Sequence, residues 1–207
     1  MPKVSQEHMD GRQRQILAAA GRCFASVGFH AATMQDVIKA SGLSAGAIYN
    51  HFSGKEEIIA AIAQERHERE AALCRAAEAE ADPYVAIQRL ARTFFEHLSD
   101  EGQEEERRVG VQLWAETLNN KKLLRHAKDG TAEPYRVLSR LIDRMKAAGD
   151  LPDDIDSGAA ARVMIALFQG LVLQKCRDRD LDLKAYMRVV LLLWEGLRGK
   201  PRAARRK

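Results

Sequence analysis

The chain has 207 residues, of which 46% are hydrophobic and 30% are charged, with only five prolines, so we expect long helices. Its length allows one large domain, or a small head on a larger body. We find no apolar run long enough to span a bilayer, and the N-terminal segment lacks the apolar core of a signal peptide. These features argue against a membrane partner and predict a soluble, cytoplasmic protein.

The net charge of +4 is unevenly distributed along the chain. Residues 1–55 carry six Lys and Arg against three Asp and Glu, and residues 198–207 carry six against none. The segment between them holds 21 basic and 26 acidic residues, a net charge of −5. A basic head can bind a polyanion, whereas an acidic body is repelled by one. Residues 199–207 lack large apolar side chains, and we expect them to form a disordered basic tail.

Cysteine and histidine usage gives no sign of a metal or a cofactor. Cys23, Cys74 and Cys176 are far apart, with no C-x-x-C motif and no histidine cluster nearby. Cys23 falls on the expected buried side of the first helix as a small core residue. Redox sensing by Cys74 or Cys176 stays open. We therefore predict no metal site and no cofactor.

Residues 33–55 have the signals of two short helices joined by a tight turn. Thr33 is a good N-cap, and Asp36 places a carboxylate in the first turn, where free N–H groups favour it. Gly42 suits the left-handed conformation at the end of the first helix. Ser44 can then cap the second helix. The pattern predicts a helix-turn-helix.

The second helix has an inner and an outer face. Ile48 and Phe52 lie four residues apart and share the face that packs on the first helix. The outward residues are Gly46, Ala47, Tyr49 and Asn50. Phe52 is therefore a core residue, and Tyr49 is a surface residue.

A third helix is expected to begin beside this outer face. Ser53 and Glu56 have the spacing of a capping box, which starts the helix near Lys55. A helix start with a lysine nearby suits a phosphate group.

These residues resemble the DNA-binding head of the TetR/AcrR family of bacterial transcriptional regulators. The matching positions are Thr33, Asp36, Val37, Gly42, Leu43, Ser44, Gly46, Ile48, Tyr49, His51, Phe52 and Lys55. The preceding amphipathic run, which ends in the sequence FASVGF, resembles the first helix of that family and its closing Gly28. Ile38 and Ser41 stand where alanine is commoner, and they bear on packing between the two short helices. The resemblance covers about the first quarter of the chain.

The resemblance and the outer face together predict the residues that contact DNA. They are Thr33, Ser44, Ala45, Gly46, Ala47, Tyr49, Asn50, His51 and Lys55. For His51, phosphate contact and simple packing both remain open. Because the outer face lacks Arg, Lys and Gln, it cannot read guanine bidentately, although Asn50 can pair with adenine and Ala47 can touch a thymine methyl. Phosphate contacts and DNA shape should then supply much of the affinity.

The rest of the chain has helical patterns and no β alternation. We expect helices over residues 53–81, from Pro83 with Asp82 as its N-cap to near Gly102, and around residues 109–118. Residues 121–148 hold one helix or two, with Gly130 and Pro134 as the expected interruption. The predicted fold is all-α. It has a three-helix DNA-binding head over 1–55, a helical effector-binding and dimerisation domain over 56–198, and the tail over 199–207.

The last two expected helices, Ser157–Lys175 and Leu183–Leu197, are apolar around nearly their whole circumference. A surface helix has one apolar stripe, so these helices need cover on a second side. A central helix pair within one protomer is the alternative, but little chain remains to wrap it. A second copy in a twofold four-helix interface fits better, and the family resemblance also implies it. The expected interface residues are Val163, Leu167, Gly170, Leu171, Val190, Leu193, Trp194 and Leu197.

The resemblance also implies a small-molecule effector pocket in the larger domain. The candidate lining residues, each of which can equally be plain core, are Phe94, Phe95, His97, Trp114, Glu116, Leu118, Met145, Met164 and Phe168. The runs LWAE and LFQGLVLQ resemble the C-terminal domain of the betaine-pathway repressor subgroup, and this likeness assigns no ligand.

Together these features predict a homodimeric, ligand-responsive regulator, most simply a repressor that a small-molecule effector releases from a palindromic double-stranded DNA operator. An activator of the same fold remains open. A helical protein-binding adaptor with a structural helix-turn-helix is a further alternative, against which the exposed Tyr49 and the basic head argue. An enzyme is disfavoured because we find no nucleophile turn, H-E-x-x-H motif, phosphate loop or dinucleotide fingerprint.

Overall fold

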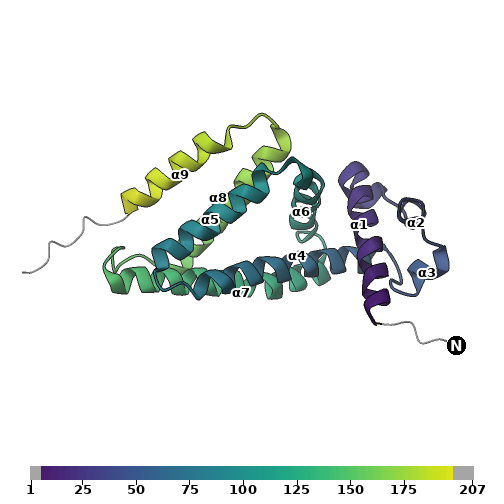
Figure 1. Cartoon of the computed structure of the whole chain (residues 1–207), viewed down its shortest axis with the longest axis horizontal. Coiled ribbons are helices and arrows are strands. Elements are labelled where there is room, and N and C mark those ends of the chain that lie inside the picture. Colours follow the sequence, from purple (N-terminus) through teal and green to yellow (C-terminus); the bar gives the residue numbers. More distant parts are fainter. Residues whose placement is uncertain (1–5, 198–207) are drawn as a thin grey trace, which may run out of the picture. The chain divides into compact units, whose positions relative to one another are not determined.

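The computed structural model describes the backbone of residues 6–197 and the side chains of residues 11–197. Within that range the chain is helical throughout, which confirms the all-α prediction (Figure 1). The elements are α1 (Gln6–Ala31), α2 (Met34–Ser41), α3 (Ala45–Tyr49), α4 (Lys55–Glu78), α5 (Pro83–Ser99), a 3-10 turn η1 (Glu101–Gln103), α6 (Glu104–Glu116), α7 (Lys121–Ala148), α8 (Ser157–Arg177) and α9 (Leu183–Leu197). The predicted tail at 199–207 lies outside the described residues.

The helices form two compact units. The N-terminal unit comprises residues up to 67 together with 102–128, and the C-terminal unit comprises 68–101 and the residues from 129 onward. Because α4 and α7 are long, each contributes to both units. This division differs from the boundary expected at residue 55, since α6 belongs to the N-terminal unit.

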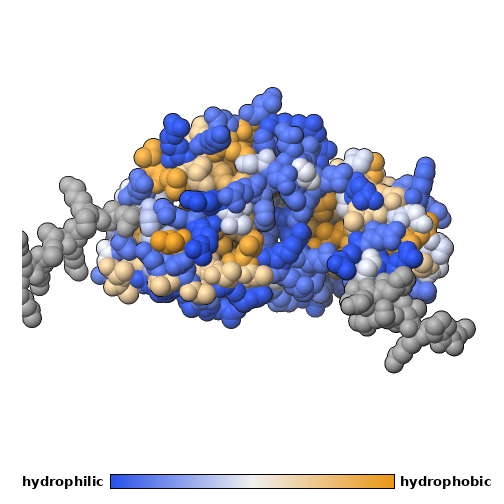
Figure 2. All heavy atoms as spheres, in the orientation of Figure 1, coloured by the Kyte–Doolittle hydropathy of each residue, from blue (hydrophilic) through white to orange (hydrophobic). Residues whose placement is uncertain are grey.

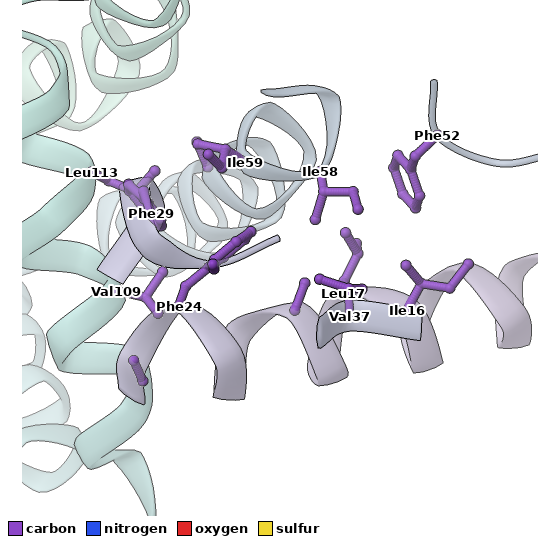
Figure 3. Close-up of a cluster of buried hydrophobic side chains, with 14 of the residues drawn as sticks. Ile16, Leu17, Phe24, Phe29, Val37, Phe52, Ile58, Ile59, Val109 and Leu113 are labelled. Atoms are coloured by element: carbon purple, nitrogen blue, oxygen red, sulfur yellow. The ribbon is translucent and has the colours of Figure 1, made fainter. Parts of the chain in front are cut away.

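The N-terminal unit has one hydrophobic core, built from α1, α2, α3, the start of α4, and α6 (Figure 3). Phe24 and Phe29 of α1 meet edge to face with ring centroids 5.0 Å apart. Val109 and Leu113 of α6 join the same cluster. These contacts explain why α6 folds with the DNA-binding head rather than with the larger domain.

The C-terminal unit has its own core. Leu141, Ile142 and Met145 of α7 are fully buried in it. Cys74 of α4 belongs to the same cluster, and burial raises the pKa of its thiol to about 12. A thiol with such a pKa is poorly reactive, so this finding argues against redox sensing by Cys74.

Of the two alternatives for residues 121–148, the structure has one helix, because α7 runs without interruption through Gly130 and Pro134, the positions where a break was expected. A proline inside a helix crowds the carbonyl of the residue four positions earlier. Here that residue is Gly130, whose backbone can adjust its dihedral angles more freely because it has no side chain. Pro134 itself is buried, which adds packing to offset the lost hydrogen bond.

Helix α8 is long and apolar enough to cross a membrane by length and composition, with a mean hydropathy of 1.3 over its 18-residue window. The expectation that no segment is long and apolar enough to span a bilayer is therefore wrong for α8. Polar residues interrupt its apolar runs, but the mean hydropathy over the window remains high despite them. Only 17% of that window is buried in the single chain. Such exposure also fits a helix that packs against another protein surface.

Candidate nucleic-acid interface

Helix α2 begins and ends, and helix α3 begins, where the sequence predicts. Thr33 and Asp36 form a capping box: the Thr33 hydroxyl accepts from the Asp36 amide (3.2 Å), and the Asp36 carboxylate accepts from the Thr33 amide (2.9 Å). The Thr33 hydroxyl also donates to the Asp36 carboxylate (2.7 Å), and this bond, followed by the bond from the Thr33 amide, lowers the pKa of Asp36. Gly42 ends α2 with φ 68°, and the Ser44 hydroxyl accepts from the Ala47 amide at the start of α3 (3.2 Å).

Helix α1 holds the C-terminal end of α2 through side chains that the sequence did not single out. The Gln15 amide donates to the carbonyl of Ser41 (2.8 Å), and Arg22 donates to the carbonyl of Ala40 (3.4 Å). The Ser41 hydroxyl donates to the carbonyl of Ile38 (2.9 Å) and accepts from the amide of Leu43 (3.2 Å). Ser41, a departure from the family pattern, therefore gives the turn two extra hydrogen bonds.

Helix α3 has the predicted inner and outer faces. Ile48 and Phe52 are buried at 0% and 3% exposure, whereas Tyr49 is 52% exposed. The other outward candidates are exposed at Ala45, Gly46 and Asn50 and half-buried at Ala47. The helix is shorter than expected and ends at Tyr49, because the amide of His51 bonds to the carbonyl of Ile48 (2.9 Å) and tightens the last turn.

His51 lies at the edge of this face. Its side chain is half-buried, and its ring lies 6.5 Å from that of Phe52, centroid to centroid, at a tilt of 39°. Both interpretations of His51, packing and phosphate contact, are compatible with this position.

Lys55 has a different role from the expected one. Its ammonium group donates to the carbonyls of Phe29 (2.6 Å), Ala32 (2.9 Å) and His30 (3.4 Å). An ammonium group has three N–H donors, so the end of α1 uses all of them. The expected phosphate contact would require Lys55 to leave these carbonyls, and we remove it from the proposed DNA contacts.

The capping box expected of Ser53 and Glu56 does not form, and Ser53 bonds to the side chain of Glu57 instead. The Glu57 carboxylate accepts from both the amide and the hydroxyl of Ser53, each at 2.7 Å. These two bonds lower the pKa of Glu57, the amide bond contributing most. Helix α4 still starts at Lys55, as the sequence predicts.

The nine candidate effector residues are divided between the two units. Trp114, Glu116 and Leu118 belong to the N-terminal unit. Glu116 pairs there with His30 (3.3 Å) beside a small hollow of about 150 Å³, and Leu118 is 83% exposed, which does not suit a pocket wall. Trp114 lies under the guanidinium of Arg66, 5.6 Å from its ring centroid.

The other six candidates belong to the C-terminal unit. Phe94 of α5 and Phe168 of α8 pack with ring centroids 4.6 Å apart, and Met164 packs against the same core, while Phe95 is half-buried. Met145 is fully buried, as expected of plain core. His97 is exposed. Trp194 of α9, which was expected at the dimer interface, instead packs on this core with its indole N–H buried and without a hydrogen-bond partner.

The remaining interface candidates divide by exposure. Leu171 is 1% exposed and packs within its own chain, so it cannot contact a partner as expected. Gly170 and Val190 are half-buried. Exposed positions are Val163, Leu167, Leu193 and Leu197, together with three that the sequence analysis missed, Leu173, Val189 and Leu192. Figure 2 shows hydrophobic residues gathered on the surface over α9.

Two family models match the chain. Residues 16–62 match bacterial regulatory proteins of the tetR family, and residues 83–193 match the C-terminal domain of BetI-type transcriptional repressors. The second match spans more than half of the chain. The protein therefore belongs to the TetR family of transcriptional regulators, a family of non-enzymes, and carries a BetI-type C-terminal domain.

Individual relatives agree with this assignment. The HTH-type transcriptional repressor Rv1474c of Mycobacterium tuberculosis is 29% identical over 87% of this chain and 90% of its own length. Among solved structures, the fatty acid degradation regulator FadR of Bacillus halodurans has a TM-score of 0.79 at 23% identity and covers 96% of this chain and all of its own. A SmeT–triclosan complex has a TM-score of 0.75 at 23% identity, with 93% of each chain covered. Both structures share the fold.

Proposed function

We propose that this TetR-family regulator is a homodimeric repressor that binds a palindromic operator through α3 and releases it when a small-molecule effector binds. The observation that carries the proposal is the face of α3. Its inner residues, Ile48 and Phe52, are buried, and Tyr49 stands half exposed on the opposite side. A short helix with one face buried and the other face outward is the geometry of a recognition helix in a DNA groove.

The proposed DNA contacts are the predicted set without Lys55. Ala45, Gly46 and Ala47 have small side chains, which allow the backbone of α3 to approach the duplex closely. Tyr49 and Asn50 follow on the exposed side. The Ser44 hydroxyl accepts a capping bond and keeps a donor that can reach a phosphate. The Thr33 hydroxyl already donates to the Asp36 carboxylate (2.7 Å), so a phosphate contact from Thr33 would require that bond to break. His51 is kept as an edge contact.

The dimer proposal is supported by where exposed apolar side chains lie. Of eleven exposed large hydrophobic residues in the described part of the chain, seven are on α8 and α9. A concentration of exposed apolar side chains on two helices favours a protein interface there. A twofold arrangement of the two helices from each copy would cover it and present two α3 helices to one duplex.

The effector proposal is supported by the core of the C-terminal unit. Phe94, Phe168 and Trp194 supply aromatic surface there, and the indole N–H of Trp194 lacks an acceptor. A molecule with apolar bulk and one hydrogen-bond acceptor would suit these groups. A melting-temperature screen with lipophilic compounds and metabolites tests this, because a ligand that binds the folded state raises its stability.

Gel shift at low salt with the DNA that flanks the protein's own gene tests operator binding. The wild-type protein should shift this DNA, and Tyr49→Ala should weaken binding by roughly 10- to 100-fold through the loss of a ring at the contact face. Tyr49→Phe, which keeps the ring, is the matched control and should stay close to wild type. Equal binding by wild type and Tyr49→Ala would show that this face is not used.

A further inference from the structure

Helix α1 is broken near its C-terminal end. Gly28 has φ 84° and ψ 163°, a conformation that side chains other than glycine essentially exclude. Because the backbone leaves helical geometry at this point, polar groups on either side of the break need partners from outside α1. The residues that follow the break, Phe29 to Ala32, lead directly to the capping residue of α2.

One side chain from α6 satisfies a group on each side of the break. The amide N–H of Phe29 donates to Oε1 of Gln112 (3.0 Å), and Nε2 of Gln112 donates to the carbonyl of Phe24 (2.9 Å). A carboxamide offers an acceptor and a donor side by side, so only one of its two orientations makes both bonds. Gln112 is half-buried, and its Oε1 lies 3.7 Å from the position of a Cβ added at Gly28.

Helix α6 is itself anchored to α4 within the same unit. Gly110 is buried, and a Cβ added there would lie 2.4 Å from a guanidinium nitrogen of Arg66. The absence of a side chain at Gly110 thus makes room for Arg66, which also lies over the ring of Trp114. Gln112 is therefore presented from an anchored helix and not from a free surface.

The other end of the segment is also fixed. Lys55 of α4 binds the carbonyls of Phe29 and Ala32, immediately after the Gln112 bridge and immediately before Thr33. The entry into α2 thus depends on two side chains, Gln112 from α6 and Lys55 from α4. The first fixes the bend of α1, and the second closes its last turn.

We propose that Gln112 is a positioning residue for DNA binding, whose amide sets the bend at Gly28 and thereby the placement of α2 and α3 against the duplex. The inference rests on the proposed operator binding. It assigns to one α6 side chain a role that neither the sequence pattern nor the fold alone gives.

Gln112→Leu tests this role, because it keeps the approximate volume and removes both hydrogen bonds. Operator affinity should fall by roughly tenfold. This is the effect expected if part of the free energy of the two lost hydrogen bonds is needed to hold the DNA-binding conformation. The same substitution at Gln88, a half-buried glutamine of α5 in the C-terminal unit, is the matched control and should change operator affinity less than twofold. A folded, wild-type-like Gln112→Leu would overturn the proposal.

Gln112→Glu separates a hydrogen-bonding role from simple packing. An ionised carboxylate accepts from Phe29 but cannot donate to the carbonyl of Phe24, whereas a protonated one does both. Facing a carbonyl and partly desolvated, this carboxyl should have a raised pKa. The affinity of the variant, divided by that of wild type, should therefore recover as the pH falls from about 8 to about 5.5. A pH-independent ratio would contradict the bridge.

The ratio to wild type is needed because other charged groups lie close by. Arg108 and Glu116 are one turn before and after position 112 on α6, and Glu116 pairs with His30 of α1. These groups are present in both proteins, so division by the wild-type affinity isolates the effect of the changed side chain at position 112.

Hydrogen exchange distinguishes failure of this inference from failure of the proposed function. The amide of Phe29 should exchange at least tenfold faster in Gln112→Leu than in wild type, whether or not DNA binds. If wild type binds no flanking DNA but this difference is present, operator binding is wrong and the bridge stands. If the exchange is unchanged, the bridge itself is wrong.

Discussion

The DNA-binding unit and the α8–α9 segment of the C-terminal unit are held by different kinds of interaction. Around the helix-turn-helix, side chains bind backbone groups at the helix ends: Gln15 at the end of α2, Lys55 at the end of α1, and Gln112 at the break in α1. On α8 and α9, by contrast, the prominent feature is exposed apolar surface, as at Leu192 and Leu193. Directional bonds fix a position to a fraction of an ångström, whereas apolar surface supplies attraction without fixing geometry closely.

This difference suits the two proposed tasks. A recognition helix must present Tyr49 and its neighbours in one orientation, because base edges and phosphates occupy fixed places on the duplex. A dimer interface that also responds to an effector benefits from surfaces that can repack. We therefore expect substitutions in the first region to change DNA affinity with the dimer intact, and substitutions in the second to act on assembly.

The largest effect is expected from an acidic residue in the apolar α8–α9 surface. Leu193→Glu should convert the dimer to monomers, because burying an unpaired carboxylate in an interface is costly. Operator affinity should then fall by about 10²- to 10⁴-fold through loss of simultaneous binding at two half-sites. Sedimentation and anisotropy titration measure the two effects. Val27→Glu, at an exposed valine of α1 (54% exposed), is the matched control and should stay dimeric; a dimeric Leu193→Glu would contradict the assigned interface.

Salt should also separate the two regions. If about three cations per protomer reach phosphates, a plot of log affinity against log salt should have a slope near −5, while dimerisation through an apolar surface should depend little on salt. Candidate cations with described side chains are Arg12, Arg14, Arg22 and Lys39, since Lys55 is bound to carbonyls. A slope close to zero for operator binding would rule out the phosphate-dominated account.

Removal of a helix cap should have a moderate effect confined to the DNA-binding unit. Ser44→Ala deletes the hydroxyl that accepts from the Ala47 amide and should lower the free energy of unfolding by about 1 kcal/mol. Chemical denaturation measures this change. Ser26→Ala, at an exposed serine inside α1 that caps no helix, should change stability less. An equal loss at both positions would mean that the cap of α3 has no special role.

The smallest effect is a pH dependence that comes from the caps. Hydrogen bonds lower the pKa values of Asp36 and Glu57 below their ordinary values of 3.8 and 4.5. Their contribution to stability is therefore complete above those values and is lost as the pH falls through the lowered folded-state values. Asp36→Asn should make the melting temperature less sensitive to pH in this acidic range. If wild type and variant lose stability in parallel on acidification, the Asp36 cap is not responsible.

The sequence predicted the features that depend on neighbouring residues. Thr33, Gly42 and Ser44 act within three residues of themselves, so local rules for helix ends placed them correctly. The amphipathic spacing of Ile48 and Phe52 likewise gave the buried face of the helix-turn-helix.

Features that depend on contacts distant in sequence were not predictable in this way. Lys55 binds carbonyls 23 to 26 residues away, and Gln112 binds groups 83 and 88 residues away, so no local pattern marks either role. The packing of Leu171 and Trp194 on the core of their own chain was also not predictable. A helix that is apolar on all sides gives no indication of which side faces that core. The sequence therefore identified the two helices that carry exposed apolar surface but not which of their residues face the chain's own core.

Hydroxyl-radical footprinting of the wild-type protein on the DNA flanking its gene tests the central claim most directly. If two copies of α3 engage one face of a duplex, two protected half-sites should appear about 10.5 base pairs apart, or a multiple of that distance, and both should disappear together with Tyr49→Ala. A single protected segment, or a double footprint that Tyr49→Ala leaves unchanged, would contradict the account.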